Sequence, residues 1–293
     1  MSKPDWSIEG RDWPHAQASR FVTAGDVRWH VQVLGSGPAL LLLHGSGASA
    51  HSWRDVAPLL AERFTVIAPD LPGHGFSATP RFGGMNLPAM ARRCAGLLGA
   101  LELAPAGLVG HSAGAAIALR MCLDGLARPQ GVVSINGALE PFPGAASIVF
   151  PVLAQALFLN PLAVRLFAWR ARSAGAVERL IQSTGSTLDA RGLELYRRLL
   201  AYSGHVEGAL GMMAAWDLEP LRRDLPNLRT PLTLIAGQRD AAVPPGVAEE
   251  AAARVPGARL ERLEKLGHLA HEEAPGRVAG LVAQALADVR GDA

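Results

Sequence analysis

Short uninterrupted apolar runs recur along the chain, and most are followed by a turn and then by a helical pattern. Such runs predict strands that are covered on both faces of a parallel sheet, whereas residues 28–34 alternate as a half-buried strand does. The alternation of strand and helix is typical of an α/β protein with a mostly parallel sheet flanked by helices. The predicted strands are 28–34, 39–43, 64–68, 106–109, 132–135, 232–236 and 259–263. The first predicted helix lies after the loop at 44–47 and ends near residue 62. The other predicted helices are 88–103, 112–126, one near 247–254, and one after 272.

The alternation stops between residues 138 and 224, where the pattern is helical throughout. We therefore predict a core domain of residues 1–137 and 225–293, with a helical cap of residues 138–224 inserted before the strand that carries the acid. The apolar residues of the cap favour packing against the core first, a wide apolar pocket second and contact with a membrane surface third. The interpretation as a membrane-contacting surface depends on the flanking arginines, which are Arg165, Arg170 and Arg172.

The composition argues against several classes of protein. The 293 residues carry a formal net charge of +2 and no dense cluster of lysine and arginine, which argues against a nucleic-acid binder. Cys94 and Cys122 are too few for a disulfide framework and are interpreted as free thiols. The N-terminal segment has no apolar stretch of signal-peptide length, and the most apolar stretch, 147–169, is interrupted by prolines and an arginine. We predict a cytoplasmic protein, with peripheral membrane contact as an option.

The candidate nucleophile lies in Gly-His-Ser-Ala-Gly at 110–114, which matches the G-x-S-x-G pattern of a strained strand-to-helix turn. An apolar strand precedes the motif and a helix of small residues follows it, as this turn requires. The turn exposes the hydroxyl of Ser112 and aims the N–H of Ala113 at the oxyanion that forms during acyl transfer. We predict Ser112 as the nucleophile.

A serine hydroxyl needs a base, and the base needs an acid to orient it. In hydrolases with this turn the chain order is Ser, acid, His. Asp240 follows the predicted strand 232–236, and His268 follows the strand 259–263. Both come at the carboxyl ends of strands, where open α/β sheets place their sites. We predict that His268 takes the proton of Ser112 and that Asp240 orients His268.

Other polar residues compete for these roles. Asp70 also ends a strand, but it precedes the serine and begins a Pro/Gly loop, so a structural role is favoured. Asn136 lies where some hydrolases carry their acid, yet it supplies no charge. His271 is interpreted as a group behind the catalytic residues or on the surface. His111 has no evident part in proton transfer, and His44 is expected to hold a neighbouring loop in place.

The loop at 44–47 is predicted to supply the second oxyanion donor, because its glycines let the backbone approach the substrate. We predict the N–H groups of Ser46 and Ala113 as the oxyanion hole, with Gly47 as the alternative to Ser46. The residues predicted to line the substrate pocket are His44, Gly45, His111, Phe142, Phe150 and Trp216.

Together these motifs resemble the α/β-hydrolase superfamily over nearly the whole chain. They are HGSG at 44–47, PDLPGHGFS at 69–77, GHSAG at 110–114, GQRD at 237–240 and GHLAHEEAP at 267–275. The resemblance implies the α/β-hydrolase fold and a serine mechanism, but a family in this fold indicates mechanism better than substrate.

A narrower resemblance is carried by segments of the N-terminal arm and the insertion that generic hydrolases do not share. These are 4–6, 10–15, 28–32, 136–139, 211–213 and 216–218, which look like the magnesium-chelatase accessory proteins (the BchO type) of bacteriochlorophyll synthesis. This resemblance implies a bacterial protein acting near the tetrapyrrole pathway.

Three functions follow from these observations. The first is ester-type hydrolysis of an apolar or amphipathic substrate, with a tetrapyrrole as one option. The second is a non-catalytic accessory or tetrapyrrole-binding protein that assists magnesium chelatase. The third is carbon–carbon bond hydrolysis or a cofactor-free haloperoxidase-like activity, whereas dehalogenases and epoxide hydrolases need Asp at position 112. No metal or organic cofactor is predicted, because the Gly-x-Gly segments lack the context of a dinucleotide site.

Overall fold

A computed structural model describes residues 2–141 and 160–291, which are organised around one eight-stranded sheet. The strands are β1 (Ser19–Ala24), β2 (Val27–Leu34), β3 (Ala39–Leu43), β4 (Thr65–Pro69), β5 (Pro105–His111), β6 (Gly131–Ile135), β7 (Leu232–Gly237) and β8 (Arg259–Leu263). Their order across the sheet is β1-β2-β4-β3-β5-β6-β7-β8. The β1–β2 and β2–β4 pairs are antiparallel, and every pair from β4 to β8 is parallel. The predicted mostly parallel α/β sheet is thus confirmed.

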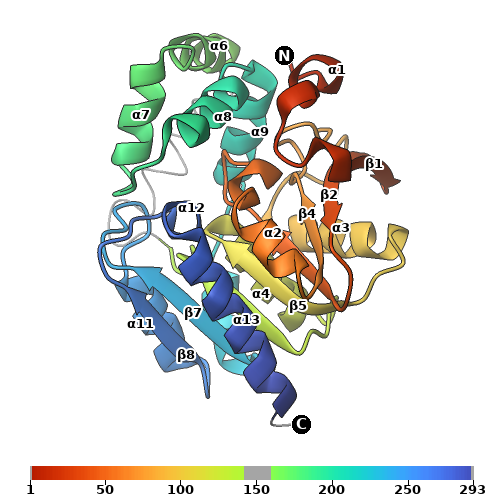
Figure 1. Ribbon diagram of the computed structural model, residues 1–293, viewed down its shortest axis with the longest axis vertical. Helices are drawn as coiled ribbons and strands as arrows, with labels where there is room; N and C mark the ends of the chain where they lie inside the picture. The colour runs from red at the N-terminus through yellow and green to blue at the C-terminus, as the bar shows by residue number, and fades with distance from the viewer. Residues whose placement is uncertain (1, 142–159, 292–293) are drawn as a thin grey trace.

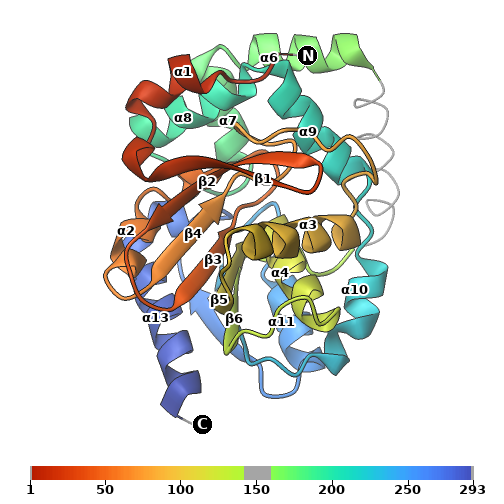
Figure 2. The ribbon, with the colours of Figure 1, turned by 90° about the vertical axis from the view of Figure 1, so that its right-hand side faces the viewer.

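Helices cover both faces of this sheet (Figures 1 and 2). On one face lie α3 (Leu87–Ala100), α4 (Ala113–Leu123) and α11 (Gly246–Arg254), and on the other α2 (Val56–Ala61) and α13 (Pro275–Gly291). Successive side chains of a strand point to opposite faces, so Leu41 and Leu43 of β3 join one apolar cluster while Leu40 and Leu42 join the other. This double coverage is why β3 reads as an uninterrupted apolar run.

Four helices of the predicted insertion stand over one end of the sheet (Figure 1). They are α6 (Pro161–Arg170), α7 (Ala174–Gln182), α8 (Ala190–Leu200) and α9 (Ser203–Ala214), and we call them the cap helices. Asn160 and Asp189 accept backbone N–H groups in the first turns of α6 and α8, which fixes where these helices begin. By contrast, α10 (Glu219–Asp224) lies beside α4 of the core (Figure 2). The boundaries of the predicted cap stay a prediction.

Residues 2–18, the N-terminal arm, bind the cap helices on one side. The arm contains α1 (Trp6–Glu9) and two short 3₁₀ turns. The backbone N–H of Gly204 in α9 donates to the carbonyl of Ser2 at 2.7 Å. Arg198 of α8 donates to Glu9 at 2.6 Å, and the hydroxyl of Tyr202 donates to Glu9 at 2.7 Å.

The other side of the arm packs against the core. The ring of Trp6 lies 4.8 Å from that of His30 and 4.9 Å from that of Phe76, measured between centroids. The side-chain amide of Gln32 in β2 donates to the carbonyl of Pro14 at 2.6 Å. The arm therefore joins the cap helices to the edge of the sheet independently of the chain connections of the cap.

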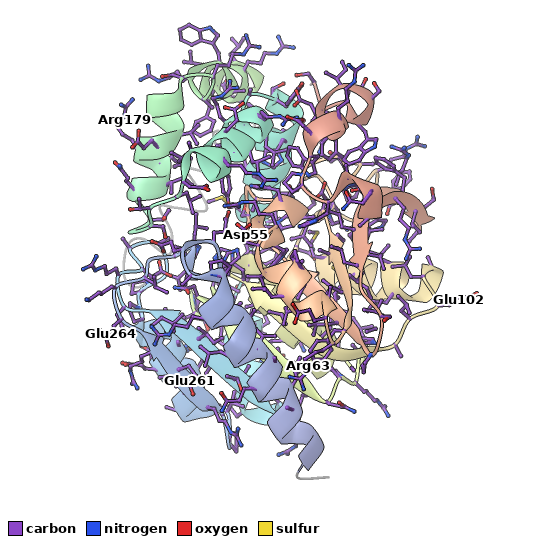
Figure 3. The ribbon with its side chains drawn as sticks, viewed as in Figure 1. Asp55, Arg63, Glu102, Arg179, Glu261 and Glu264 are labelled. Carbon is purple, nitrogen blue, oxygen red and sulfur yellow. The ribbon has the colours of Figure 1, made fainter. Side chains whose placement is uncertain are left out.

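A buried ionic cluster forms a second junction between cap and core. Arg54 follows a 3₁₀ turn (Ala50–Trp53), and Glu272 lies in α12 (Ala270–Glu273). The Arg54 guanidinium binds Glu272, and Tyr196 of α8 donates its hydroxyl to the same carboxylate at 2.7 Å. Asp55, labelled in Figure 3 where cap and core meet, lies 3.2 Å from Arg54. Burial raises the pKa of Glu272 to about 7 against the opposing effect of Arg54.

Candidate active site

The sharp turn between β5 and α4 carries Ser112. Its backbone has φ 52° and ψ −118°, a conformation that a residue with a side chain adopts only under local constraint. The constraint is visible on both sides, because the N–H of Ser112 donates to the carbonyl of Ile135 and its carbonyl accepts from Ala115 and Ala138. Ser112 is half-buried, and α4 begins at the next residue, Ala113. The serine thus lies in the strained turn that the motif predicts.

The glycines of this motif are required by close backbone contacts. A Cβ on Gly110 would lie 2.4 Å from backbone atoms of Ala115, and one on Gly114 would lie 2.1 Å from the carbonyl oxygen of Leu43. Neither contact can be relieved by moving a flexible side chain. The turn at Ser112 can therefore form only with glycine at both positions.

Asp240 and His268 lie together at the carboxyl end of the parallel strands. Asp240 follows β7, His268 follows β8, and Nδ1 of His268 lies 2.7 Å from Oδ2 of Asp240. An ionised carboxylate only accepts hydrogen bonds, so Nδ1 carries the proton and the lone pair of His268 is on Nε2. This is the tautomer that can take a proton from a serine hydroxyl.

The carboxylate of Asp240 is fully occupied and its side chain is buried. Oδ1 accepts the backbone N–H groups of Ala242 at 2.8 Å and Val243 at 2.7 Å. Oδ2 accepts the side-chain amide of Asn136 at 2.6 Å in addition to His268. Asn136, at the end of β6, therefore helps to hold the carboxylate of Asp240 in place.

His111, the residue before Ser112, joins the segment that carries Ser112 to the segment that carries His268. His111 contributes Nε2 to a 2.8 Å hydrogen bond with the carbonyl of His268, and the two rings lie 4.7 Å apart. Among the described residues, no hydrogen bond links the hydroxyl of Ser112 to His268. Catalytic hydrogen bonds in free enzymes are commonly long and tighten when substrate binds.

His44 holds the loop at 44–47 as expected from the sequence. Its Nδ1 donates to the carbonyl of Gly45 at 2.7 Å, and its Nε2 accepts the N–H of Leu71 at 2.8 Å. A Cβ on Gly45 would lie 2.9 Å from Cβ of Ser112, so the loop passes directly beside the serine. The N–H of Ser46 belongs to the same planar peptide as the Gly45 carbonyl, and His44 thereby fixes its direction.

Asp70 has the structural role expected for it. Oδ1 accepts the N–H of Ala50 at 2.7 Å, and Oδ2 accepts the N–H of Phe76 at 2.8 Å and faces Nδ1 of His30 at 2.9 Å. Burial opposes ionisation, but His30 and these N–H groups together hold the pKa of Asp70 below its usual range. The carboxylate ties together two core loops.

His271 lies behind the candidate catalytic residues and not on the surface. It is fully buried, with its ring 4.3 Å from that of His111 and 4.7 Å from that of Trp53. Of the predicted pocket residues, Trp216 is partly buried and packs against the main apolar cluster. Phe142 and Phe150 lie outside the described residues. In the described ranges, no group of His, Cys, Asp and Glu side chains is arranged to hold a metal ion.

A loop between α7 and α8 supports the segments that carry Asp240 and His268, and the sequence analysis did not find it. The carbonyl of Thr184 accepts the N–H of Ala241 at 3.1 Å and that of His268 at 3.3 Å. The hydroxyl of Ser186 accepts the N–H of Leu269 at 2.8 Å. These contacts join segments that lie between 57 and 84 residues apart in the sequence, so no local motif marks them.

The fold agrees with the family to which the sequence is similar. A family model described as the alpha/beta hydrolase fold matches residues 38–275, and the chain belongs to that family. Its sequence is 43% identical over 277 residues to the magnesium-chelatase 30 kDa subunit of Rhodobacter capsulatus, covering 92% of this chain and 95% of that protein. Both resemblances seen in the motifs are thereby confirmed.

Solved structures with the same fold include two that cover most of this chain. One is a thermophilic esterase from Thermogutta terrifontis, with a TM-score of 0.71, 26% identity, and coverage of 92% of this chain and 98% of that one. Another is an alpha/beta hydrolase fold protein from Burkholderia ambifaria, with a TM-score of 0.76, 24% identity, and coverage of 89% and 97%.

Proposed function

We propose that the protein is a serine hydrolase that cleaves an ester or a related acyl bond. The observation that carries the proposal is the Asp240–His268 pair, 2.7 Å apart, at the same sheet edge as a serine in a strained strand-to-helix turn. A hydroxyl, an imidazole of defined tautomer and a buried carboxylate in this order are what acyl transfer to serine needs.

In the proposed mechanism, Ser112 attacks the substrate carbonyl while Nε2 of His268 takes its proton. The N–H groups of Ser46 and Ala113 bind the oxyanion, and Asp240 stabilises the imidazolium. His268 then gives the proton to the leaving alcohol or amine, which departs and leaves an acyl group on Ser112. Water attacks this acyl group with His268 again as base, so that the acid product is released and the serine is restored.

For the substrate we propose a small apolar or amphipathic molecule, with a tetrapyrrole as one option. The support is the similarity to the magnesium-chelatase 30 kDa subunit over 92% of the chain. The same similarity supports a role beside magnesium chelatase in bacteriochlorophyll synthesis, and hence a cytoplasmic location. It also supports the second candidate, an accessory protein whose catalytic residues are not used.

Covalent labelling by a fluorophosphonate tests the proposal directly. Ser112 is expected to displace fluoride from the probe and form a stable phosphonyl ester, because His268 removes its proton. Cleavage after arginine yields the peptide 94–120, whose one hydroxyl-bearing side chain is that of Ser112. Tandem mass spectrometry should place the adduct there, and acid-denatured protein serves as the control. A native protein that stays unlabelled would refute the proposed mechanism.

The outer face of α6 supports the proposed peripheral contact with a membrane. Leu162, Leu166 and Trp169 recur at helical spacing and are 72%, 57% and 62% exposed. Between Glu140 and Glu178 the sequence has no acidic residue. Exposed arginines flank this face, namely Arg165, Arg170, Arg172 and, projecting from α7 in Figure 3, Arg179. Apolar residues with flanking positive charge suit an anionic lipid surface. No described helix is both long and apolar enough to span a bilayer.

Co-sedimentation with lipid vesicles measures this contact. The protein is expected to pellet with phosphatidylglycerol vesicles and to be released by salt, because charge attraction contributes to binding. Trp169→Glu should abolish pelleting. Leu59→Glu is the matched control, since Leu59 is 41% exposed on α2 of the core and should not matter. Equal pelleting of the two variants would rule out the α6 face.

A further inference from the structure

The cap helix α9 rests directly on the backbone of two core loops. Gly208 meets Gly73 so closely that a Cβ on Gly208 would lie 2.0 Å from the carbonyl oxygen of Gly73. At the next residue of α9, the carbonyl of Ala209 accepts a hydrogen bond from the hydroxyl of Ser46 at 3.4 Å. With His205, these residues of α9 lie on one helix face at spacings of three and four.

We propose that His205 is a positioning residue that holds the oxyanion loop, residues 44–47, in its catalytic shape, and so makes that shape depend on the seating of the cap. The inference rests on the proposed hydrolase function. His205 does not touch the reacting atoms; it acts through the backbone of Gly47.

Both ring nitrogens of His205 are committed to backbone groups of the core. The N–H of Gly75 donates to Nδ1 at 3.0 Å, so Nδ1 must be unprotonated. Nε2 therefore carries the proton and donates it to the carbonyl of Gly47 at 3.1 Å. The side chain is fully buried, and burial lowers the pKa of His205 to about 3, which keeps the ring neutral. The two hydrogen bonds then select one tautomer of the neutral ring.

The contact with Gly47 fixes the part of the loop that His44 does not reach. His44 binds the carbonyl of Gly45 from the core side, and the N–H of Ala48 donates to that carbonyl at 3.2 Å. The carbonyl of Gly47 lies in the same peptide as that N–H, so His205 holds this peptide from the cap side. Gly47 has φ 77°, a conformation that glycine leaves easily when it is not held. The N–H groups of Ser46 and Gly47 lie between the two histidine contacts.

Two substitutions separate the two nitrogens of His205. In His205→Asn the side-chain oxygen replaces Nδ1 and keeps the Gly75 contact, but it is too short to reach Gly47. In His205→Gln the amide N–H replaces Nε2 and keeps the Gly47 contact. Met213→Ala is the control, because Met213 is 40% exposed on the same helix. Thermal unfolding is measured for all three, so that loss of fold is distinguished from loss of loop geometry.

Hydrolysis of short aryl esters is the first readout. We expect kcat of His205→Asn to fall about 10²-fold, since misplacing a catalytic group by 1 Å can cost that much, with KM within about threefold of wild type. His205→Gln should retain kcat within about fivefold, and the control should match wild type. Equal loss in both His205 variants, or no loss in His205→Asn, would overturn the inference.

Amide hydrogen exchange of residues 44–48 is the second readout and does not depend on turnover. Protection of Ala48 should be lost in His205→Asn and kept in His205→Gln. If wild-type protein shows no Ser112-dependent hydrolysis, the proposed hydrolase function fails, and exchange still decides whether His205 holds the loop. Unchanged protection in His205→Asn would show that it does not.

Discussion

Replacement of Ser112 by Ala is expected to lower kcat for short aryl esters by about 10⁶-fold, the size of loss seen when a serine nucleophile is removed. The remaining rate would come from substrate binding and from the oxyanion hole, which the substitution leaves in place. KM should change little, because the hydroxyl contributes to bond making more than to ground-state binding. Steady-state kinetics on protein expressed in a host without related esterase activity would measure the effect.

Ser183→Ala is the matched control for this experiment. Ser183 is exposed at the end of α7, where its hydroxyl donates to the carbonyl of Leu180 at 2.7 Å. It should hydrolyse the ester at the wild-type rate. If Ser112→Ala kept more than about one thousandth of wild-type kcat, another group would have to be the nucleophile.

The same substitution distinguishes the two candidate functions in a cell. A Rhodobacter capsulatus strain that lacks its own magnesium-chelatase 30 kDa subunit provides the background, because that protein covers almost the whole of this chain. If hydrolysis is the biological role, Ser112→Ala should fail to restore pigment where wild type succeeds. Full restoration by Ser112→Ala, at equal protein level, would favour the accessory role.

Below about pH 6 the free energy of unfolding is expected to fall steeply, because several histidines are buried in the neutral form. Burial is the largest cause of the lowered pKa of each of them in the folded protein. They are His44, His51, His74, His111, His205 and His271. In the unfolded chain these side chains take up protons near pH 6.5. The unfolded state then binds up to six more protons than the folded state, so stability is lost as the pH falls.

Glu272 opposes this loss of stability at low pH, but it contributes only one proton to the difference between the folded and unfolded states. Its pKa is raised from 4.5 to about 7, so between these values the folded state holds a proton that the unfolded state has lost. This contribution stabilises the fold as the pH falls from 7 toward 4.5. Each net proton changes stability by about 1.4 kcal/mol per pH unit. Since domains are stable by about 5–15 kcal/mol, we expect acid unfolding with a midpoint between about pH 5 and pH 6.

Denaturant titrations at a series of pH values from 7.5 to 5 measure this dependence. His51→Gln provides the internal comparison: it removes one buried neutral histidine, and the pH slope of its unfolding free energy should drop by about one proton. The slope is the relevant quantity, because the substitution can also change stability at every pH. A stability that stays constant from pH 7.5 to pH 5 would contradict the expectation.

The sequence predicts the sheet well where strands are buried on both faces, because burial there leaves a continuous apolar run. It does not predict β1, whose six residues are mostly exposed or half-buried and which pairs only with β2 at the edge of the sheet. The predicted helix after residue 47 is also divided, into a 3₁₀ turn over Ala50–Trp53 and the short α2. Edge strands and short helices depend on their tertiary contacts more than on a local pattern.

For the candidate site, the sequence indicates the residues whose chemistry is tied to a motif or to a strand end. Ser112, Asp240 and His268 are of this kind. The residues that support them are not: Thr184 and His205 act across the gap between cap and core, through backbone groups far away in the sequence. His271 is ambiguous from sequence for the same reason, since its burial is produced by His111 and Trp53.

The N-terminal arm changes what kind of cover the cap can be. A helical cap that is attached to the core only by its two chain connections can move as a rigid body away from the core. Here Ser2 and Glu9 also bind α9 and α8, while Trp6 of the same arm packs against Phe76 of the core. The cap helices are therefore attached to the core by the N-terminal arm in addition to the chain itself. We therefore expect the N-terminal arm, together with the Arg54–Glu272–Tyr196 cluster, to limit how far the cap helices can move away from the sheet.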